Sequence, residues 1–245
     1  MANSSPDTID NISDNGRLTP KGQRTRLSIL EAALTLFAQK GYQASTMREI
    51  AQAADCSLGL AYRYFPSKED LVVALYDNTC SELRDYVAAL PKTSMATRYT
   101  STIRNAYVRL GPYREAFAAI SSVTMDPSSH AGVLSDRMGY LRRQGIDVIR
   151  VVLAEAKDAP SAKDLETLTL LGYASYLLLL LFWVQDRTEG QRATDKLMKF
   201  VEETIGRLRP LLNVPMLAQP LTQLAEIIRP VFWGRDEACI PNPSV

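Results

Sequence analysis

Histidine and cysteine are scarce in this chain, and their scarcity limits the chemistry that it supports. Its 245 residues contain one histidine, His130, and three cysteines, Cys56, Cys80 and Cys239, without CxxC spacing. A zinc site built from histidines or paired cysteines is therefore not expected. The isolated cysteines suit a reducing compartment and exclude a disulfide scaffold. We expect no metal, no cofactor and a cytoplasmic location.

An excess of charge of either sign is also missing. Lysine and arginine number 28 and aspartate and glutamate 27, so the net charge of +1 gives the chain as a whole no attraction for nucleic acid. Residues 1–18 begin with neither a basic nor an apolar run, and we interpret them as a disordered polar lead-in, not a signal peptide. Any affinity for nucleic acid must come from local clusters of basic residues.

Signals for β-strands are nearly absent, whereas apolar residues recur at spacings of three and four, so the predicted fold class is all-α. One apolar stretch, residues 167–185, contains no formal charge and has a borderline length for a membrane span. Its flanks lack a Lys/Arg bias. We therefore expect no membrane and interpret the stretch as a helix buried all round, in the core or at a subunit interface. A membrane-surface interaction protein is the alternative, and it would partition into detergent or lipid.

Capping signals divide the chain into helices. Three short helices are predicted before residue 66, and their start and stop signals are Thr19–Pro20, Gly41, Thr46 with Glu49, Ser57 and Pro66. Longer helices should follow at about 67–90, 94–110, 112–124, 130–156, 161–185 and 190–212. Pro215, Pro220 and Pro230 should break the remainder into pieces, with one short helix docked on the core. The predicted divisions are 1–18 lead-in, 19–75 small domain, 76–213 larger domain and 214–245 C-terminal extension.

A basic cluster coincides with the short helices. Residues 17–68 contain eight basic and three acidic side chains. Two short helices joined by a three-residue turn form a helix-turn-helix, whose second helix can enter the major groove of DNA. Short paired helices and solvated basic faces also occur in ordinary bundles, so this pattern alone leaves DNA binding open.

The residues of this segment resemble a known family. TMREIAQAADCSLGLAYRYFPSKEDL, residues 46–71, is similar to the helix-turn-helix of the TetR (tetracycline repressor) regulators. The likeness covers about residues 20–72, and Asp55 replaces the glycine usual in the turn. It implies an N-terminal three-helix DNA-binding domain and a larger helical domain for ligand binding and dimerisation. It also implies a ligand-responsive regulator, most simply a repressor, with an activator of the same fold as the alternative.

The predicted DNA-binding residues lie in and around the two short helices. They are Thr46, Arg48, Ser57, Leu58, Gly59, Leu60, Tyr62, Arg63, Tyr64 and Lys68. Arginine can read guanine, hydroxyls and ammonium groups can bind phosphates, and glycine permits close approach of the backbone. The two leucines stand where many family members have polar residues, and they suit thymine methyl groups. Arg17, Lys21, Arg24 and Arg26 form an arm that either follows the phosphates or is simply solvated.

Two copies of the chain are needed for specificity. Seven residues of helix reach only about 10 Å at ~1.5 Å per residue, so one copy reads only a few base pairs. A twofold pair predicts a near-palindromic double-stranded DNA operator. The resemblance implies that the last two helices of the main body form the homodimer. The candidate interface residues are Gly172, Ser175, Leu178, Phe182 and Leu208.

The resemblance also implies a small-molecule pocket in the larger domain. Tyr107, Phe117, Met125, Tyr173 and Tyr176 suit an apolar or aromatic effector, although such residues also build ordinary cores. His130 lies in an SSHAG turn and is interpreted as an exposed loop residue. No pair of carboxylates or nucleophile motif stands out, so we do not expect an enzyme.

Overall fold

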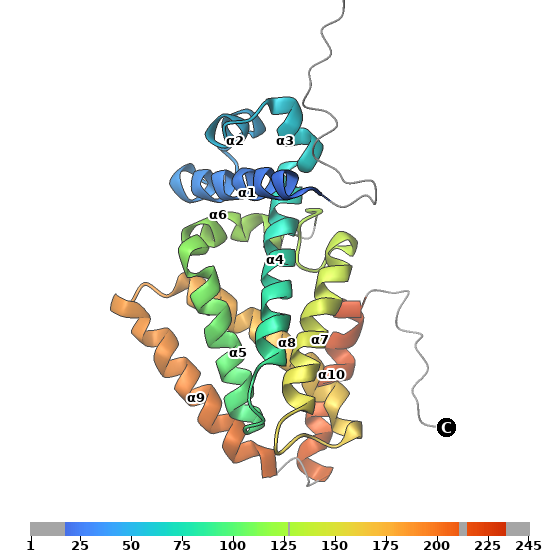
Figure 1. The fold of residues 1–245 in the computed structure, drawn as a ribbon. Coiled ribbons are helices and arrows are strands. Elements are labelled where there is room, and N and C mark those ends of the chain that lie inside the picture. The colour runs from blue at the N-terminus through green and yellow to red at the C-terminus, as the bar shows by residue number, and fades with distance from the viewer. Residues whose placement is uncertain (1–17, 127, 211–214, 234–245) are drawn as a thin grey trace, which may run out of the picture. The chain divides into compact units, whose positions relative to one another are not determined.

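The structure, a computed structural model, describes residues 18–126, 128–210 and 215–233. These residues contain ten α-helices and no β-strand, which confirms the predicted all-α class (Figure 1). The helices are α1 Pro20–Lys40, α2 Met47–Ala53, α3 Leu58–Tyr64, α4 Lys68–Ala88, α5 Met95–Leu110, α6 Arg114–Met125, α7 Gly139–Ala154, α8 Ala162–Gln185, α9 Arg192–Leu208 and α10 Pro215–Trp233. Residues 1–17, which include Arg17, and 234–245, which include Cys239, lie outside the described residues.

The chain forms two compact units. The N-terminal unit contains the residues up to Leu75 together with Glu115–Ser121, which the sequence analysis placed in the larger domain. The C-terminal unit contains Tyr76–Arg114 and the residues from Ser122 onward. Helix α4 begins in the first unit and ends in the second.

The N-terminal unit is built on a small apolar core beneath three capped helices. Thr19 caps α1 by accepting from the Gly22 amide at 3.1 Å, and Pro20 occupies the first turn, where its missing N–H costs nothing. Helix α1 packs on α2, and α2 packs on α3. The core of this unit includes four buried residues: Leu34, Phe37, Ala61 and Phe65.

The C-terminal unit is a bundle in which α5 packs on α7 and α9, and α8 packs on α7 and α10. Its core contains Tyr99, Ile103, Ile149 and Met198, all at or below 3% exposure. Helix α8 is long and apolar enough to cross a membrane by length and composition alone, and 44% of its most apolar stretch is buried inside the protein. It is not buried all round, because Leu178 is 67% exposed.

The predicted start of a helix near His130 is wrong. Helix α7 begins only at Gly139, because the preceding residues satisfy their polar groups within a loop. Asp126 accepts from the Ser128 amide at 2.8 Å, and a Cβ at Gly132 would lie 2.7 Å from the Asp126 carbonyl oxygen. His130 is exposed in this loop.

The predicted fragmentation of the C-terminal extension is also wrong. Residues Pro215–Trp233 form one helix of 19 residues, with Pro220 and Pro230 inside it. Both of these prolines are exposed, so water can satisfy the carbonyls that lose a helical partner. Burial of Ala225, at 1% exposure, holds the helix in place.

Candidate nucleic-acid interface and ligand cavity

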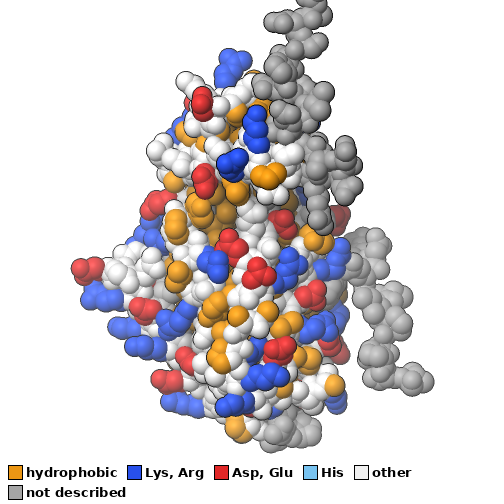
Figure 2. Space-filling model, viewed as in Figure 1, with side chains coloured by type: hydrophobic (Ala, Val, Ile, Leu, Met, Phe, Trp, Pro, Cys, Tyr) orange, Lys and Arg blue, Asp and Glu red, His pale blue; other side chains and the backbone are white. Residues whose placement is uncertain are grey.

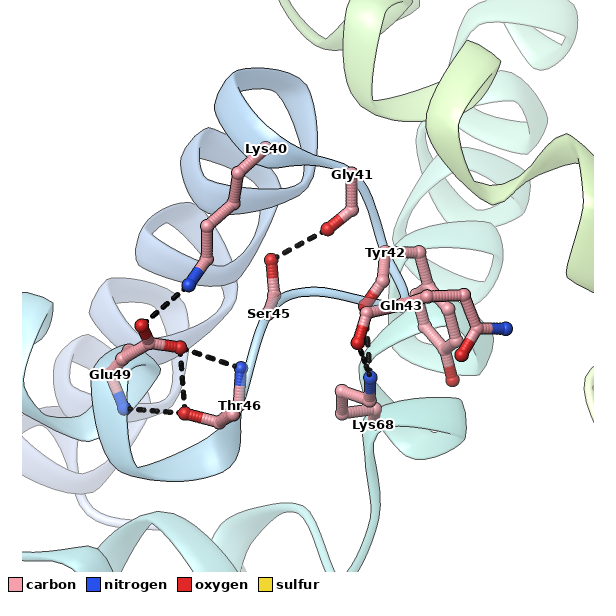
Figure 3. A network of polar contacts seen from close by, with 8 residues as sticks. All are labelled: Lys40, Gly41, Tyr42, Gln43, Ser45, Thr46, Glu49 and Lys68. Atoms are coloured by element: carbon pink, nitrogen blue, oxygen red, sulfur yellow. Dashed lines mark hydrogen bonds and ion pairs between the residues drawn. The ribbon is translucent and has the colours of Figure 1, made fainter.

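Helix α2 begins with a complete capping box at Thr46 (Figure 3). The Thr46 hydroxyl accepts from the Glu49 amide at 3.3 Å, and the Glu49 carboxylate accepts from the Thr46 amide at 2.9 Å and from its hydroxyl at 2.7 Å. Lys40 donates to the same carboxylate at 2.5 Å and, with Thr46, lowers the pKa of Glu49 to about 2. Thr46 is therefore a cap, and binding a phosphate through its amide or hydroxyl proton would require displacing Glu49.

The turn between α2 and α3 has the geometry that a helix-turn-helix requires. Asp55 adopts a left-handed backbone with φ of 51°, a region that aspartate tolerates better than most residues. The Cys56 amide donates to the Ala51 carbonyl at 3.0 Å and closes the turn. Ser57 then caps α3 by accepting from the Leu60 amide at 3.1 Å.

Helix α3 has one buried and one exposed face. Ala61 is fully buried at 0% exposure, Tyr62 is 47% exposed, and Arg63 is also exposed. The remaining predicted contacts on this helix, Leu58, Leu60 and Tyr64, are half-buried. The helix therefore offers a mixed polar and aromatic surface, with its leucines partly used for packing.

Gly59 lies on the exposed face of α3, and no contact with the residues that the structure describes requires a glycine there. A Cβ built there meets no atom within 4 Å, and its φ is outside the left-handed range, in contrast to Gly41, whose φ is 87°. Glycine in a helix lowers stability by roughly 0.5–1 kcal/mol relative to alanine. Close approach of an external molecule to the helix backbone would account for it.

The basic residues of the N-terminal unit divide into exposed and engaged groups. Arg48 is exposed on α2 and has no hydrogen bond or ion pair to the residues that the structure describes. Lys68 instead donates to the carbonyls of Tyr42 at 2.9 Å and Gln43 at 3.4 Å, and burial lowers its pKa. These bonds brace the loop before α2 and leave Lys68 one N–H for an outside partner (Figure 3).

The predicted basic arm is mostly open to solvent. Lys21 and Arg24 are exposed, whereas the Arg26 guanidinium lies 5.1 Å from the centre of the Phe65 ring. Figure 2 shows both basic and acidic side chains on the surface of each unit.

The C-terminal unit contains an apolar cavity. It is lined from α4, α5, the loop before α7, α7 and α8 by Tyr76, Thr79, Cys80, Leu83, Thr102, Val133, Met138, Leu141, Arg142, Gly145, Val148, Ile149, Tyr173, Tyr176, Leu177 and Leu180. Two of the five predicted ligand-binding residues, Tyr173 and Tyr176, are among them. The other lining residues were not predicted, because only the tertiary structure brings the middle of α4 to the same cavity as α7 and α8.

The other three predicted ligand-binding residues lie elsewhere. Tyr107 stacks on Trp183 with ring centres 5.2 Å apart, and its hydroxyl donates to the Leu179 carbonyl at 2.9 Å. Phe117 is buried within the N-terminal unit, and Met125 is 54% exposed. His130 does not line the cavity either.

The cavity carries polar groups but no carboxylate. Burial raises the pKa of Tyr76 to about 12 and that of the Cys80 thiol to about 11, so both are neutral near pH 7. Arg142 donates to the carbonyls of Ser135 at 2.8 Å, Val133 at 3.1 Å and Phe232 at 2.8 Å. Its charge is thus directed at backbone oxygens, and the site suits an uncharged ligand.

The predicted dimer residues separate into two groups. Leu178, Phe182 and Leu208 are exposed, at 67%, 41% and 51%, as an interface requires. Phe200 on α9, which the sequence analysis did not select, is 64% exposed.

The two small residues of the predicted interface do not belong to this exposed face. A Cβ on Gly172 would lie 2.9 Å from Ile149 on α7, and Ser175 shares a 2.6 Å hydrogen bond with the Tyr99 hydroxyl. They allow α8 to approach other helices of its own chain, because a helix with apolar residues on all sides does not reveal which side faces inward.

Among the described residues, no group of three His, Cys, Asp or Glu side chains is placed to hold a metal ion.

Comparisons with known proteins agree on one family. Residues 29–75 match the sequence model for bacterial regulatory proteins of the tetR family. The chain is 45% identical over 65 residues to the HTH-type transcriptional repressor KstR of Rhodococcus jostii, covering 26% of this chain and 28% of KstR. The chain thus aligns with less than a third of that relative's length.

Solved structures extend the likeness to the fold. A TetR transcriptional regulator from Nitrosomonas europaea covers 75% of this chain and 98% of its own length, with a TM-score of 0.58 and 21% identity. The regulator FadR from Bacillus subtilis, solved in complex with stearoyl-CoA, covers 71% of this chain and 96% of its own, with a TM-score of 0.56 and 14% identity. Residues 29–75 therefore carry the sequence pattern of the tetR regulatory proteins, and the chain shares the fold of the solved TetR regulators.

Proposed function

We propose that this protein is a cytoplasmic transcriptional repressor that binds a near-palindromic operator as a homodimer and is released by a small uncharged apolar molecule. The observation that carries the proposal is the exposed face of α3, where Tyr62 and Arg63 lie one turn after Gly59, a glycine with open space beside its backbone. Such a face fits a major groove, with the backbone close to DNA at Gly59.

The proposed contacts have different roles. Arg48 and Arg63 are the candidates for reading guanine, because an arginine can bond to both O6 and N7. Ser57, Tyr62 and the remaining donor of Lys68 are candidates for phosphate contacts, which fix register without reading sequence. Leu58 and Leu60 are left for thymine methyl groups.

We propose the exposed apolar residues of α8 and α9 as the dimer surface. Leu178, Phe182, Phe200 and Leu208 leave apolar area in water that a second copy would bury. A twofold pair presents two copies of α3, which lengthens the sequence that is read.

The cavity beside Tyr173 and Tyr176 is the proposed effector site. The fold neighbour FadR was solved in complex with stearoyl-CoA, which supports ligand control for this fold. Release from DNA requires that the effector bind the non-DNA-binding conformation more tightly than the DNA-binding one.

A gel-shift titration with DNA from upstream of the protein's own gene tests DNA binding. Arg48→Ala and Tyr62→Ala should each abolish or strongly weaken the shift, whereas Arg192→Ala, on an exposed arginine of α9, should not. Size-exclusion chromatography with light scattering should give a dimer for all three variants. Affinity should fall steeply with added salt, because phosphate neutralisation releases counterions.

Two results would reject the proposal. The first is a shift that is unaffected by both Arg48→Ala and Tyr62→Ala, and the second is a monomer at micromolar concentration. A reporter gene under the same upstream DNA separates repression from activation, since deletion of the regulator should raise expression from a repressed promoter.

A further inference from the structure

The cavity of the C-terminal unit is small as it stands. It offers about 50 Å³ to water-sized groups, and a single water needs at least about 10–15 Å³ on that measure. There is room for only a few such groups. A ligand of two or three fused rings would therefore have to displace part of the wall.

One part of the wall is held from outside. The Tyr173 ring covers Gly145 so closely that a Cβ there would lie 2.6 Å from the ring. On α10, Phe232 meets the Tyr173 ring edge-on, with ring centres 5.8 Å apart and an angle of 79° between the planes. Tyr173 therefore cannot move toward Gly145, and Phe232 limits its movement toward α10.

The same residue of α10 also holds a second wall residue. The Phe232 carbonyl accepts from Arg142 Nε at 2.8 Å, and Arg142 lines the cavity. Both wall residues thus contact one position, which lies next to the last residue of α10 and two residues after Pro230. The carbonyls of Val133 and Ser135 also hold Arg142.

This end of α10 lies behind the wall and is a helix end, which can open locally. Pro220 and Pro230 cannot donate helical hydrogen bonds, and helix ends open at lower free energy than core segments. On the outer side of α10, Ile227 is 72% exposed and Val231 is 53% exposed, so few contacts hold that side.

We propose that Phe232 is a specificity-determining residue of the cavity, which selects ligands by size by holding Tyr173 and Arg142 in the wall. It acts as a positioning residue, because it does not itself line the cavity. Larger ligands bind after the end of α10 shifts and Tyr173 moves into the space that Phe232 occupied. This inference rests on the proposed function only in treating the cavity as the effector site.

Two neutral fluorophores that differ by one fused ring, 1-aminonaphthalene and 1-aminoanthracene, test the proposal by fluorescence titration of the full chain without DNA. Phe232→Ala should raise the preference for the larger probe by at least about tenfold, since a hydrophobic site distinguishes even one methylene by that much. Phe232→Leu, which retains an apolar side chain, should give an intermediate shift. Ile227→Ala, on the exposed side of the same helix, is the matched control and should leave the preference unchanged.

Protection of a cysteine thiol from alkylation shows where the probes bind. Cys80 lines the cavity, so a bound probe should slow alkylation of Cys80 but not of Cys56, as followed by peptide mass spectrometry. If Phe232→Ala does not fold, Phe232→Leu decides the test.

Four outcomes would overturn the proposal. They are an unchanged preference in the Phe232 variants, an equal shift in Ile227→Ala, binding without protection of Cys80, and no binding of either probe to any form. The probe titration contains no DNA, so its result does not depend on whether the protein shifts operator DNA. The proposed function and this proposal can therefore fail separately.

Discussion

Arg48 and Arg98, one from each unit, have opposite surroundings. In the N-terminal unit, Arg48 is exposed to solvent and has no hydrogen bond or ion pair to the described residues. In the C-terminal unit, Arg98 is fully buried and donates to the carbonyls of Val152 at 2.9 Å, Leu90 at 3.0 Å and Pro91 at 2.9 Å. A basic residue therefore indicates a nucleic-acid surface only where its N–H donors remain available.

Arg114 and Arg142 follow the pattern of Arg98. Arg114 donates to the carbonyls of Trp183, Val184 and Asp186, where α8 ends. Each of these arginines satisfies several backbone acceptors at once, which lets helices end inside the bundle without unpaired carbonyls. The net charge of the whole chain therefore does not separate its exposed arginines from those that are bonded to backbone carbonyls.

The largest effect should come from removing the most buried of these arginines. Arg98→Leu leaves three carbonyls without their partner, and we expect the free energy of unfolding to fall by about 3–5 kcal/mol. Urea denaturation followed by circular dichroism measures the change. Arg192→Leu, at an exposed arginine, is the control and should stay within about 0.5 kcal/mol of the wild type. Equal losses in both variants would contradict the division of the arginines.

Arg48→Ala should instead weaken DNA binding and leave the free energy of unfolding unchanged. We expect operator affinity to fall by about 1–3 kcal/mol, the usual worth of a bidentate contact to a base, with the unfolding free energy unchanged. Fluorescence anisotropy with labelled operator DNA measures the affinity. A variant that unfolds more easily but binds DNA normally would place Arg48 with the structural arginines.

Gly145 in the C-terminal unit and Gly59 in the N-terminal unit differ in the space beside them. Gly145→Ala places a Cβ 2.6 Å from the Tyr173 ring and should lower stability by about 1–3 kcal/mol, because a packed core resists added volume. Gly59→Ala meets no atom within 4 Å and should raise stability by roughly 0.5–1 kcal/mol while weakening DNA binding. Thermal melts and anisotropy together test both. Normal operator affinity in Gly59→Ala would remove close DNA approach as the reason for this glycine.

The smallest effect concerns alkaline pH. The pKa of Tyr76 is raised to about 12 in the folded protein from 10.0, chiefly by burial. The contribution of Tyr76 to the free energy of unfolding is fully present below pH 10 and is lost toward pH 12, because the unfolded chain releases this proton first. The free energy of unfolding falls in this range by at most about 1.4 kcal/mol per pH unit for this group. Tyr76→Phe should reduce the slope of unfolding free energy against pH in this range. Tyr140→Phe, on a 61% exposed residue, should leave that slope unchanged.

The N-terminal unit could be predicted closely from sequence because its signals are local. Thr46 with Glu49 and Ser57 mark helix starts within three or four residues, and the structure places caps at both positions. The role of Lys68 was less visible, since its carbonyl partners lie 25 and 26 residues away in the chain. The DNA contacts themselves stay predictions.

The C-terminal unit was harder to predict because its signals are not local. Tyr76 and Cys80 reach the cavity only when α4 packs beside α7 and α8. Gly172 and Ser175 were assigned to a subunit interface because α8 is apolar on most sides, whereas packing turns them toward α7 and α5. Pro220 and Pro230 predicted short pieces, but burial of Ala225 and Phe232 against the bundle offsets the missing hydrogen bonds of α10.

Local sequence signals were enough to specify the all-helical class and the capped helices of the N-terminal unit. Each of these depends on backbone chemistry within a few residues, which a linear sequence displays. Only the tertiary structure decided which arginines are engaged with carbonyls, which side of α8 is exposed and which residues line the cavity. Those features depend on side chains meeting across helices, and hydrophobic spacing does not specify which helices meet.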